Sequence, residues 1–381
     1  MEPSEFKSER TGILKRVPNT IFDCFEPKPL PFTITYNPEL VNLIGNTNHS
    51  LGKLSEAGRK LRNPHLLIMP YLKKEAVLSS KIEGTKTTLS DLFLHEAEKK
   101  RTANDDMEEV LNYVNALKFG LAKIETEKIS SELIKEMHKI LLKGVRGQNK
   151  NPGSYKLDLN WIGSSYDPME AKFIPCHPES VEKLIENLTN YLNEHVSESP
   201  LLRIGLAHYQ FETIHPFRDG NGRLGRLLII LFLCQQKIIN QPLLYISAFF
   251  EKYKEDYDSK LKKVSTEGDI EGWLKFFLSA IKTQSEDAVQ RVERMEELYG
   301  KYRKLLLEKS QSTTVQIILD YLFENPFITI PDVREKLNCY YPKAKYNVEI
   351  LLEVGIIEEV KRDKGERLFV AREIKEILDV N

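Results

Sequence analysis

The residues with the most evident chemistry lie in one short segment, residues 215–226, which reads HPFRDGNGRLGR. His215 supplies an imidazole, whose ordinary pKa of about 6.5 suits a general base. Asp219 supplies a carboxylate, a ligand that divalent cations prefer. Gly220 and Gly222 let backbone N–H groups converge where a side chain would block them. Together these groups predict a cradle for a di- or triphosphate that carries a cation.

Two arginines complete this segment. Arg223 and Arg226 are three residues apart, so both lie on one face of the helix that we expect to begin at the glycines. The N-terminus of such a helix carries unpaired N–H groups and partial positive charge, and it points at the same cradle. The arginines therefore predict binding of the outer phosphates.

This segment resembles the signature of Fic-domain proteins, His-x-Phe-x-(Asp/Glu)-Gly-Asn-Gly-Arg-x-x-Arg. Every specified position is filled, by His215, Phe217, Asp219, Gly220, Asn221, Gly222, Arg223 and Arg226. The resemblance implies a protein adenylyltransferase, an enzyme that moves AMP from ATP onto a Ser, Thr or Tyr hydroxyl of a target protein with the help of Mg²⁺. It also implies a mainly helical Fic core.

The resemblance assigns a role to each residue. His215 takes the proton of the hydroxyl, Asp219 holds Mg²⁺ at the α- and β-phosphates, and Asn221 with the loop N–H groups stabilises charge on the phosphate oxygens. The expected catalytic residues are His215, Asp219, Asn221 and Arg226. The expected nucleotide contacts are Gly220, Asn221, Gly222, Arg223, Leu224, Gly225, Arg226 and, on the adenine side, Tyr257.

A second match lies upstream, where residues 79–84 read SSKIEG and resemble the inhibitory motif of the same family, (Ser/Thr)-x-x-x-Glu-(Gly/Asn). Ser79 and Glu83 are four residues apart and share a helix face, and Gly84 is a good residue to follow a helix. Glu83 then meets the negative end of the helix dipole, which a cation from elsewhere would relieve. The resemblance implies that this cation is Arg226 and that the pair blocks the γ-phosphate. An ordinary solvent-exposed glutamate is the alternative.

Composition narrows the class of protein. A chain of 381 residues with 41% hydrophobic and 29% charged residues is expected to form two or three domains of a soluble protein. The net charge of −1 gives no global basic surface for nucleic acid. The four cysteines lack paired spacing, which disfavours zinc or disulfides and suits the cytoplasm. The polar N-terminus is no signal peptide, and the apolar run 227–234 is too short for a membrane and predicts a buried helix.

The first part of the chain, residues 1–124, is expected to form an arm and a helical domain that carries the inhibitory helix. Prolines before about residue 50 predict an extended arm. We expect the inhibitory helix at Tyr71–Glu83 and a further helix at Asp105–Lys123. Thr88, with Asp91 three residues later, predicts the N-cap of a helix between them.

Residues 125–290 are expected to form the Fic core, with helices at Ile129–Leu142 and Arg203–Ile214. Strand-like residues on either side of the turn-prone 164–168 predict a hairpin. In the family this hairpin is a flap that docks the target by backbone pairing, and the expected docking residues are Lys172, Phe173 and Ile174. A plain surface hairpin is the alternative. Lys156 lies in a turn where members of the family usually have arginine. This departure weakens only a peripheral part of the resemblance.

The end of the chain is expected to hold a connecting helix, residues 291–312, and a small domain, residues 313–381. Its pattern predicts helices at 314–323, 330–338 and 342–354 and strands at 356–360 and 368–370, an order typical of a winged helix. The third helix carries Lys343 and Lys345 but also Glu349 and Glu353. DNA binding therefore stays open but is not favoured over packing, homodimer formation or target docking.

Several readings stay open at this stage. A Fic transferase could use another diphosphate-linked donor, although both arginines favour ATP. A transcription regulator with a Fic sensor core is a second alternative. Tyr245 and Tyr257 could contact adenine or belong to the core, and Glu212 with His215 forms one Glu-x-x-His pattern, where a di-metal site needs two. The target protein and the signal that releases Glu83 are not readable from the sequence.

Overall fold

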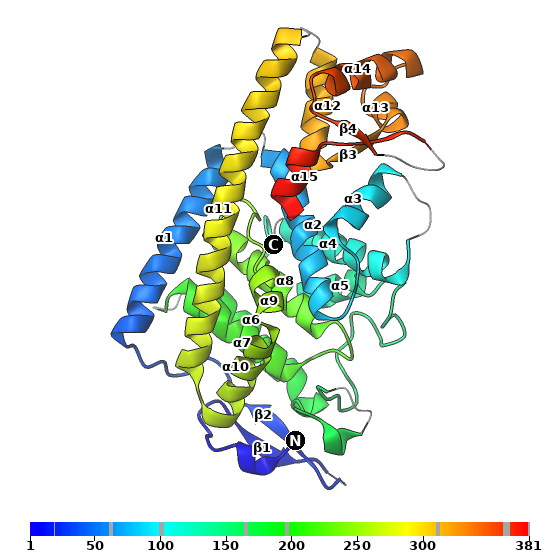
Figure 1. Cartoon of the computed structure of the whole chain (residues 1–381). Helices are drawn as coiled ribbons and strands as arrows, with labels where there is room; N and C mark the ends of the chain where they lie inside the picture. The colour runs from blue at the N-terminus through cyan, green and yellow to red at the C-terminus, as the bar shows by residue number, and fades with distance from the viewer. Residues whose placement is uncertain are drawn as a thin grey trace.

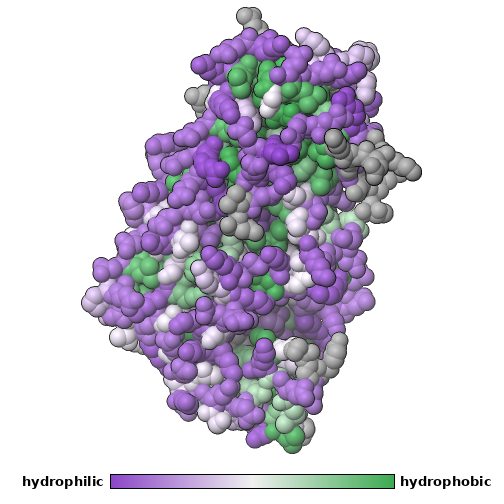
Figure 2. All heavy atoms as spheres, in the orientation of Figure 1, coloured by the Kyte–Doolittle hydropathy of each residue, from purple (hydrophilic) through white to green (hydrophobic). Residues whose placement is uncertain are grey.

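The computed structural model describes residues 1–18, 20–60, 64–98, 103–163, 167–194, 198–309, 313–360 and 366–379. Helices make up most of it, as the sequence predicts (Figure 1). The short strands lie at opposite ends of an elongated molecule, and the long helix α11 (Ile270–Lys309) runs between these ends. Figure 2 shows a mainly hydrophilic surface on this face, with an apolar area over the C-terminal elements. Within the described part of the chain, no helix combines the length and apolar character needed to cross a bilayer.

The N-terminal segment is only partly an extended arm. After the short 3₁₀ turn η1 (Pro3–Glu5), strand β1 (Gly12–Arg16) pairs antiparallel with β2 (Asp23–Pro27). Helix α1 (Pro38–Lys60) then packs along α11, so the predicted extension of the arm to residue 50 is wrong. The helix buries Leu40, Leu51 and Leu54, an apolar spacing that its many polar residues obscure in the sequence.

Three helices next build the part that carries the inhibitory motif. Helix α2 (Pro64–Ile82) begins earlier than predicted and ends one residue before Glu83. Helix α3 (Leu89–Ala97) starts at the capping box of Thr88 and Asp91, and this cap was predicted. Helix α4 (Asp105–Lys123) has the predicted bounds and packs against both α2 and α5 (Ser131–Leu141).

The core surrounds one buried helix, α8 (Asn221–Gln235), whose residues 227–233 are buried, as predicted. Helices α4, α5 and α7 contact α8, and α6 packs on α7. Helices α9 and α10 follow α8 and lead into α11. The bounds of the remaining helices are α6 (Pro178–Asn193), α7 (Pro200–Ile214), α9 (Ser247–Lys252) and α10 (Lys254–Glu267).

The predicted hairpin is reduced to one bridge, between Ile162 and Phe173. The short 3₁₀ turn η2 (Pro168–Glu170) lies between them, and residues 164–166 of the predicted turn lie outside the described residues. The segment also joins the N-terminal hairpin, because Phe25 N donates to Ile174 O at 2.8 Å. Strand β2 therefore lies beside the predicted flap.

The C-terminal elements follow the predicted order with two additions, β3 and α15. Their bounds are α12 (Thr313–Glu324), β3 (Phe327–Thr329), α13 (Ile330–Lys336), α14 (Tyr341–Glu353), β4 (Glu358–Val360), β5 (Leu368–Val370) and α15 (Arg372–Asp379). The sheet order is β3-β5-β4, and residues 361–365 of the predicted wing lie outside the described residues. The predicted boundary at residue 290 falls inside the continuous helix α11. The domain division and the winged-helix assignment stay predictions.

Candidate active site

His215 stands at the C-terminal end of α7 in a left-handed conformation, with φ 49° and ψ 61°. Its Nδ1 lies 3.2 Å from the carbonyl oxygen of Glu212, which can only accept, so Nδ1 carries the proton. Burial, and then the charge of Lys156, lower the pKa of His215 to about 4. The imidazole is therefore neutral near pH 7 with Nε2 as its free acceptor, which is the state that a general base needs.

A buried lysine and an asparagine hold the backbone around His215. Lys156 Nζ donates to Ile214 O at 3.0 Å and to Asn160 Oδ1 at 2.8 Å. Asn160 Nδ2 in turn donates to the carbonyl oxygens of His215 and Phe217, at 3.1 and 2.8 Å. Burial lowers the pKa of Lys156 to about 8. Sequence reasoning missed Asn160 and gave Lys156 a peripheral role, although a lysine in the turn where the family writes arginine was the available signal.

The loop after His215 is also braced from within. The amide of Asn221 accepts from Phe217 N at 2.9 Å and donates to Phe217 O at 2.8 Å. The Phe217 ring stacks on His138 with centroids 3.8 Å apart. His138 Nδ1 accepts from Gly153 N at 2.8 Å, so its Nε2 donates to Asp219 O at 2.9 Å. Asn221 therefore fixes the shape of the loop, and its contact with a phosphate stays a prediction.

Arg223 lies between two acidic side chains, Asp219 of the same segment and Glu109 of helix α4. Arg223 Nη1 donates to Glu109 Oε2 on α4 at 2.8 Å, and both side chains are buried. Arg223 Nη2 lies 3.8 Å from Asp219 Oδ1, which also accepts from Gly220 N at 2.6 Å. Glu109 was not predicted, because nothing in its sequence neighbourhood points to the signature. The partly exposed carboxylate of Asp219 has the chemistry that a divalent cation requires.

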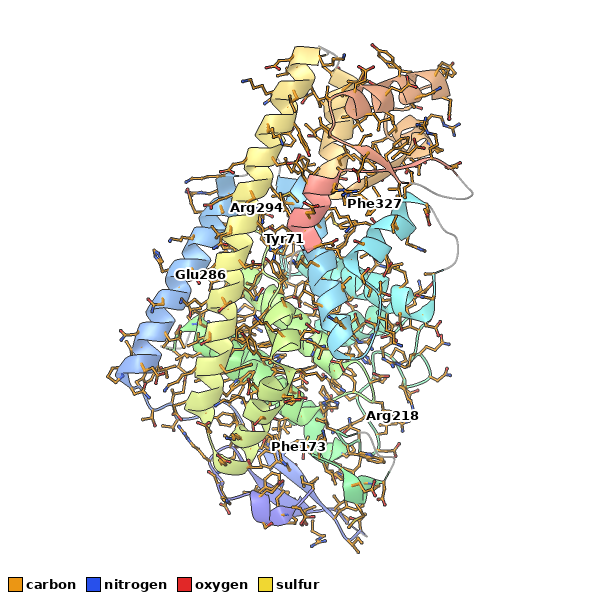
Figure 3. The ribbon with its side chains drawn as sticks, in the orientation of Figure 1. Tyr71, Phe173, Arg218, Glu286, Arg294 and Phe327 are labelled. Carbon is orange, nitrogen blue, oxygen red and sulfur yellow. The ribbon has the colours of Figure 1, made fainter. Side chains whose placement is uncertain are left out.

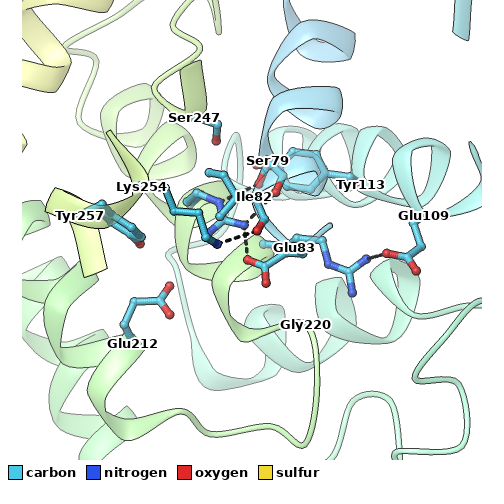
Figure 4. A network of polar contacts seen from close by, with 12 residues as sticks. Ser79, Ile82, Glu83, Glu109, Tyr113, Glu212, Gly220, Ser247, Lys254 and Tyr257 are labelled. Atoms are coloured by element: carbon cyan, nitrogen blue, oxygen red, sulfur yellow. Dashed lines mark hydrogen bonds and ion pairs between the residues drawn. The ribbon is translucent and has the colours of Figure 1, made fainter. Parts of the chain in front are cut away.

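The strongest contact of the site joins the two motifs (Figure 4). Arg226 Nη2 donates to Glu83 Oε1 at 2.6 Å and to Ser79 O at 2.9 Å, and its Nε donates to Ser79 Oγ at 2.9 Å. The predicted Ser79, Glu83 and Arg226 are thus brought together. Gly84 adopts φ +102°, which favours glycine. A Cβ at Gly222 would lie 2.5 Å from Glu83 Oε1, so this glycine makes room for the carboxylate.

Charge explains why this contact forms. Desolvation would raise the pKa of Glu83, but the charge and hydrogen bond of Arg226 outweigh it and lower that pKa. The pKa of Arg226 is raised by Glu83 against the effect of its own burial. Lys254 Nζ donates to Ile82 O at 2.8 Å, the carbonyl end of α2 (Figure 4). Two cations therefore neutralise the negative end of α2 and the carboxylate that follows it.

The remaining predicted nucleotide residues lie deeper. Leu224 is fully buried, and a Cβ at Gly225 would lie 2.3 Å from Glu212 Oε1. Tyr257 is buried, with its hydroxyl 2.7 Å from His208 Nε2. Tyr245 belongs to the core beside α11, where its hydroxyl donates to Asp287. The nucleotide contacts of Leu224, Gly225 and Tyr257 stay predictions, while Tyr245 is a core residue.

Glu212 is an acidic group that sequence reasoning considered only as a metal ligand. Its Oε1 is buried without a hydrogen-bond partner and lies 4.0 Å from His208 Nε2. Burial raises the pKa of Glu212 to about 8, against the charge of Arg226. Among the described residues, no three His, Cys, Asp or Glu side chains are grouped so as to hold a metal ion. Glu212 is therefore a neutral neighbour of Arg226 at pH 7.

The predicted docking segment is hydrogen-bonded on both sides. Phe173 exchanges backbone bonds with Ile162, at 2.8 and 3.3 Å, and Ile174 O accepts from Phe25 N of β2. Lys172 is exposed, but Phe173 and Ile174 are buried. An added strand needs unpaired backbone groups. A target strand at Phe173 or Ile174 would thus have to displace Ile162 or β2, and target docking at this segment stays a prediction.

Comparison with known proteins adds the following. Residues 41–122 match the Fic/DOC family N-terminal region, and residues 128–233 match the Fic/DOC family. A probable protein adenylyltransferase of Aquifex aeolicus is 30% identical over 179 residues, which are 45% of this chain and 51% of that protein. A protein adenylyltransferase of Caenorhabditis elegans is 32% identical over 133 residues, 33% of this chain and 24% of that protein. The chain thus spans about half or less of the length of these relatives.

Solved structures agree on the fold. A Fic family protein from Desulfovibrio desulfuricans superposes with a TM-score of 0.60 at 21% identity, over 88% of this chain and 97% of that one. A Fic-domain signalling protein from Bacteroides thetaiotaomicron gives a TM-score of 0.51 at 20% identity, over 65% of this chain and 98% of that one. At these identities the likeness shows the fold alone.

Proposed function

We propose that this chain, which belongs to the Fic/DOC family, transfers AMP from ATP to a hydroxyl of a protein and holds itself inactive through Glu83. Two of its relatives are named protein adenylyltransferases. The complete signature at residues 215–226 supports the same reaction here. The observation that carries the self-inhibition is the 2.6 Å contact between Arg226 Nη2 and Glu83 Oε1.

The residues support an in-line transfer. Nε2 of His215 accepts the proton of the target hydroxyl, and the hydroxyl oxygen forms a bond to the α-phosphorus of ATP. The bond from that phosphorus to the bridging oxygen of the β-phosphate breaks, and pyrophosphate leaves. Asp219 would hold Mg²⁺, which supplies positive charge to the phosphates when bound. Backbone N–H groups at the start of α8 stabilise charge on the phosphate oxygens.

The inhibited state follows from one occupied arginine. Arg226 is fully buried, and its guanidinium donates to Glu83 and to Ser79. A γ-phosphate cannot bind the same N–H groups while the carboxylate holds them, and the negative charge of Glu83 also repels it. His215 and its loop are meanwhile already shaped for catalysis. Removal of Glu83 alone is therefore expected to activate the enzyme.

The test uses the Glu83→Gly variant with Mg²⁺ and ATP labelled at either the α- or the γ-phosphate. Transfer of the α label without the γ label, to the protein itself or to added protein, supports the proposal. Transfer of the γ label would identify a phosphotransferase instead. Transfer of neither label by a folded variant would reject ATP as the donor, and another diphosphate-linked donor would then replace it.

A further inference from the structure

Helix α2 contacts two parts of the molecule from different sides. Glu75, Ser79 and Glu83 recur at intervals of four residues, so they share the face that points at the active site. Lys74, about a quarter turn away from Glu75, faces α15 instead, and Tyr71 lies one turn before Glu75. Tyr71 (labelled in Figure 3) packs its ring 5.4 Å from that of Tyr245, whose hydroxyl reaches Asp287 on α11. Lys74 Nζ lies 4.9 Å from the Tyr245 ring. Both sets of contacts are made by one helix. A shift of α2 that breaks the contacts of Lys74 therefore also moves Ser79 and Glu83.

The outer face of α2 is bonded to the C-terminal helix α15. Lys74 Nζ donates to Leu378 O at 2.9 Å, and both residues are buried. From α11, Arg291 Nη1 donates to the neighbouring Ile377 O at 2.6 Å. Ser90 Oγ on α3 donates to Asp379 Oδ2 at 2.9 Å. The last carbonyls of a helix have no partner within it, so side-chain donors from α2 and α11 complete the end of α15.

Helix α15 belongs to a C-terminal module, which we define as residues 313–379. A second set of contacts joins this module to helices α2 and α3. Helix α12 packs on α2, and β3 packs on α3. Between them, the buried Asn325 donates to Phe93 O on α3 at 3.0 Å. Lys73 on α2 pairs with Glu96 on α3 at 2.5 Å, and its Nζ lies 4.9 Å from the Phe93 ring. The C-terminal module is therefore docked on α2 and α3 by buried polar contacts, which tolerate little displacement.

The inner face of α2 is bonded just as specifically. The buried Glu75 accepts from Ser247 N at 3.1 Å and from the Tyr113 hydroxyl at 3.2 Å. One turn later Ser79 holds Arg226, and Glu83 completes the pair (Figure 4). Hydrogen bonds weaken steeply beyond about 3.5 Å, so a slide of α2 by about one ångström would break the Glu83 contact. The position of α2 along its axis therefore sets inhibition.

We propose that the C-terminal module is part of the inhibitory device: docked through α15, it holds α2 where Glu83 reaches Arg226, and undocking releases Glu83. The carboxylate lies one residue beyond the end of α2 and is 35% exposed, so its reach to Arg226 depends on where α2 is held, by α4 and α9 on one side and by the C-terminal module on the other. The inference rests on the proposed function. It gives residues 313–379 a regulatory role: a partner that binds this module and undocks it would start AMP transfer.

The test replaces Lys74 with methionine, which keeps the length of the side chain but removes the bond to Leu378 O. We expect Lys74→Met to raise AMP transfer about 5- to 30-fold over wild type, the change that 1–2 kcal/mol produces in an equilibrium. In a Glu83→Gly background, Lys74→Met should not raise AMP transfer further, because the inhibitory carboxylate is already absent. The matched control is Arg203→Met, which removes a buried cation that donates to Glu194 O between α6 and α7.

Amide hydrogen exchange supplies a readout that does not depend on catalysis. Lys74→Met should speed exchange in residues 74–83, while Arg203→Met, at an equal loss of Tm, should not. The inference would be overturned if Lys74→Met transferred AMP no faster than wild type and if amide exchange in residues 74–83 were no faster than in Arg203→Met. If Glu83→Gly itself transfers no AMP, the proposed function fails, and the exchange rates alone then decide whether α15 holds α2.

Discussion

The catalytic loop and the inhibitory segment meet at Arg226, but they are held in different ways. Around the loop, Lys156 and Asn221 are almost completely buried, and their side chains bond its backbone. Glu83 lies beyond the end of its helix, and its side chain is 35% exposed against 1% for Arg226. A buried, internally bonded site is pre-formed, whereas a half-exposed carboxylate can leave. In the proposed function, the molecule thus pairs a fixed active site with a removable block.

The largest expected effect comes from a change in the buried catalytic loop. His215→Ala in a Glu83→Gly background should lower AMP transfer by about 10²- to 10⁴-fold, since a general base contributes a factor of that size. The measurement is the initial rate of α-label incorporation at saturating ATP. A matched His177→Ala variant, altered in a loop before α6, should keep the rate of its parent. Near-parental activity of His215→Ala would show that another group takes the proton.

The support beneath His215 should matter next. Lys156→Met removes the only donor to Asn160 Oδ1 among the described residues and leaves Ile214 O with the weak Cys176 thiol alone, which we expect to cost about 1–3 kcal/mol of stability. In a Glu83→Gly background kcat should fall about tenfold or more with KM for ATP little changed, because the base is misplaced while the phosphate cradle stays. Lys156→Arg should recover most of kcat, and equal losses in both variants would argue against a positioning role.

On the removable side, Ser79→Ala should release the block only in part. It removes the Oγ acceptor for Arg226 Nε but leaves Glu83 in place. A lost hydrogen bond of this kind is worth about 0.5–1.5 kcal/mol, which is about a two- to tenfold rise in AMP transfer over wild type. Ser80→Ala is the control, because the buried Oγ of this neighbouring serine has no hydrogen-bond partner among the described residues. A rise as large as that of Glu83→Gly would mean that Ser79, rather than the carboxylate, holds the arginine.

A further effect, on stability rather than on AMP transfer, concerns Glu212. Its folded pKa of about 8 exceeds the unfolded value of about 4.3, so between these values the folded chain binds the extra proton. The stability that Glu212 contributes therefore falls as pH rises from about 5 to 8, by about 1.4 kcal/mol per pH unit. Urea unfolding should show the stability of wild type relative to Glu212→Gln fall by this amount per pH unit as pH rises, and level off above pH 8. A constant difference would place the pKa elsewhere.

The two regions also differ in how far the sequence predicts them. The signature, the cap at Thr88 and the meeting of Glu83 with Arg226 follow from local spacing and a specific resemblance. Glu109 and Asn160 were missed because their partners lie 114 and 55–57 residues away, and such pairs leave no local pattern. The same reason hides the bonds from α15 to α2, which join residues 304 positions apart.

Secondary structure shows the same limit. The bounds of α4 were predicted because its apolar residues recur with helical spacing between a good N-cap and a basic end. The start of α1 was missed because its polar residues hide a narrow apolar stripe. This stripe is buried through the packing of α1 along α11. Strand β3 has three residues and exists through its pairing with β5, so no periodicity could reveal it.

The comparison of a fixed site with a removable block is tested most directly by the ratio of AMP transfer rates between Glu83→Gly and wild type. The rates should be measured with the same ATP and Mg²⁺ concentrations and scored as AMP gained by intact mass. We predict a ratio of about tenfold or more, since a charge-assisted hydrogen bond is worth about 1.5–3 kcal/mol. The melting temperature should fall, because the buried Arg226 loses its paired carboxylate, while the folded loop around His215, which does not depend on Glu83, stays intact. A ratio near one with the fold intact would contradict the account.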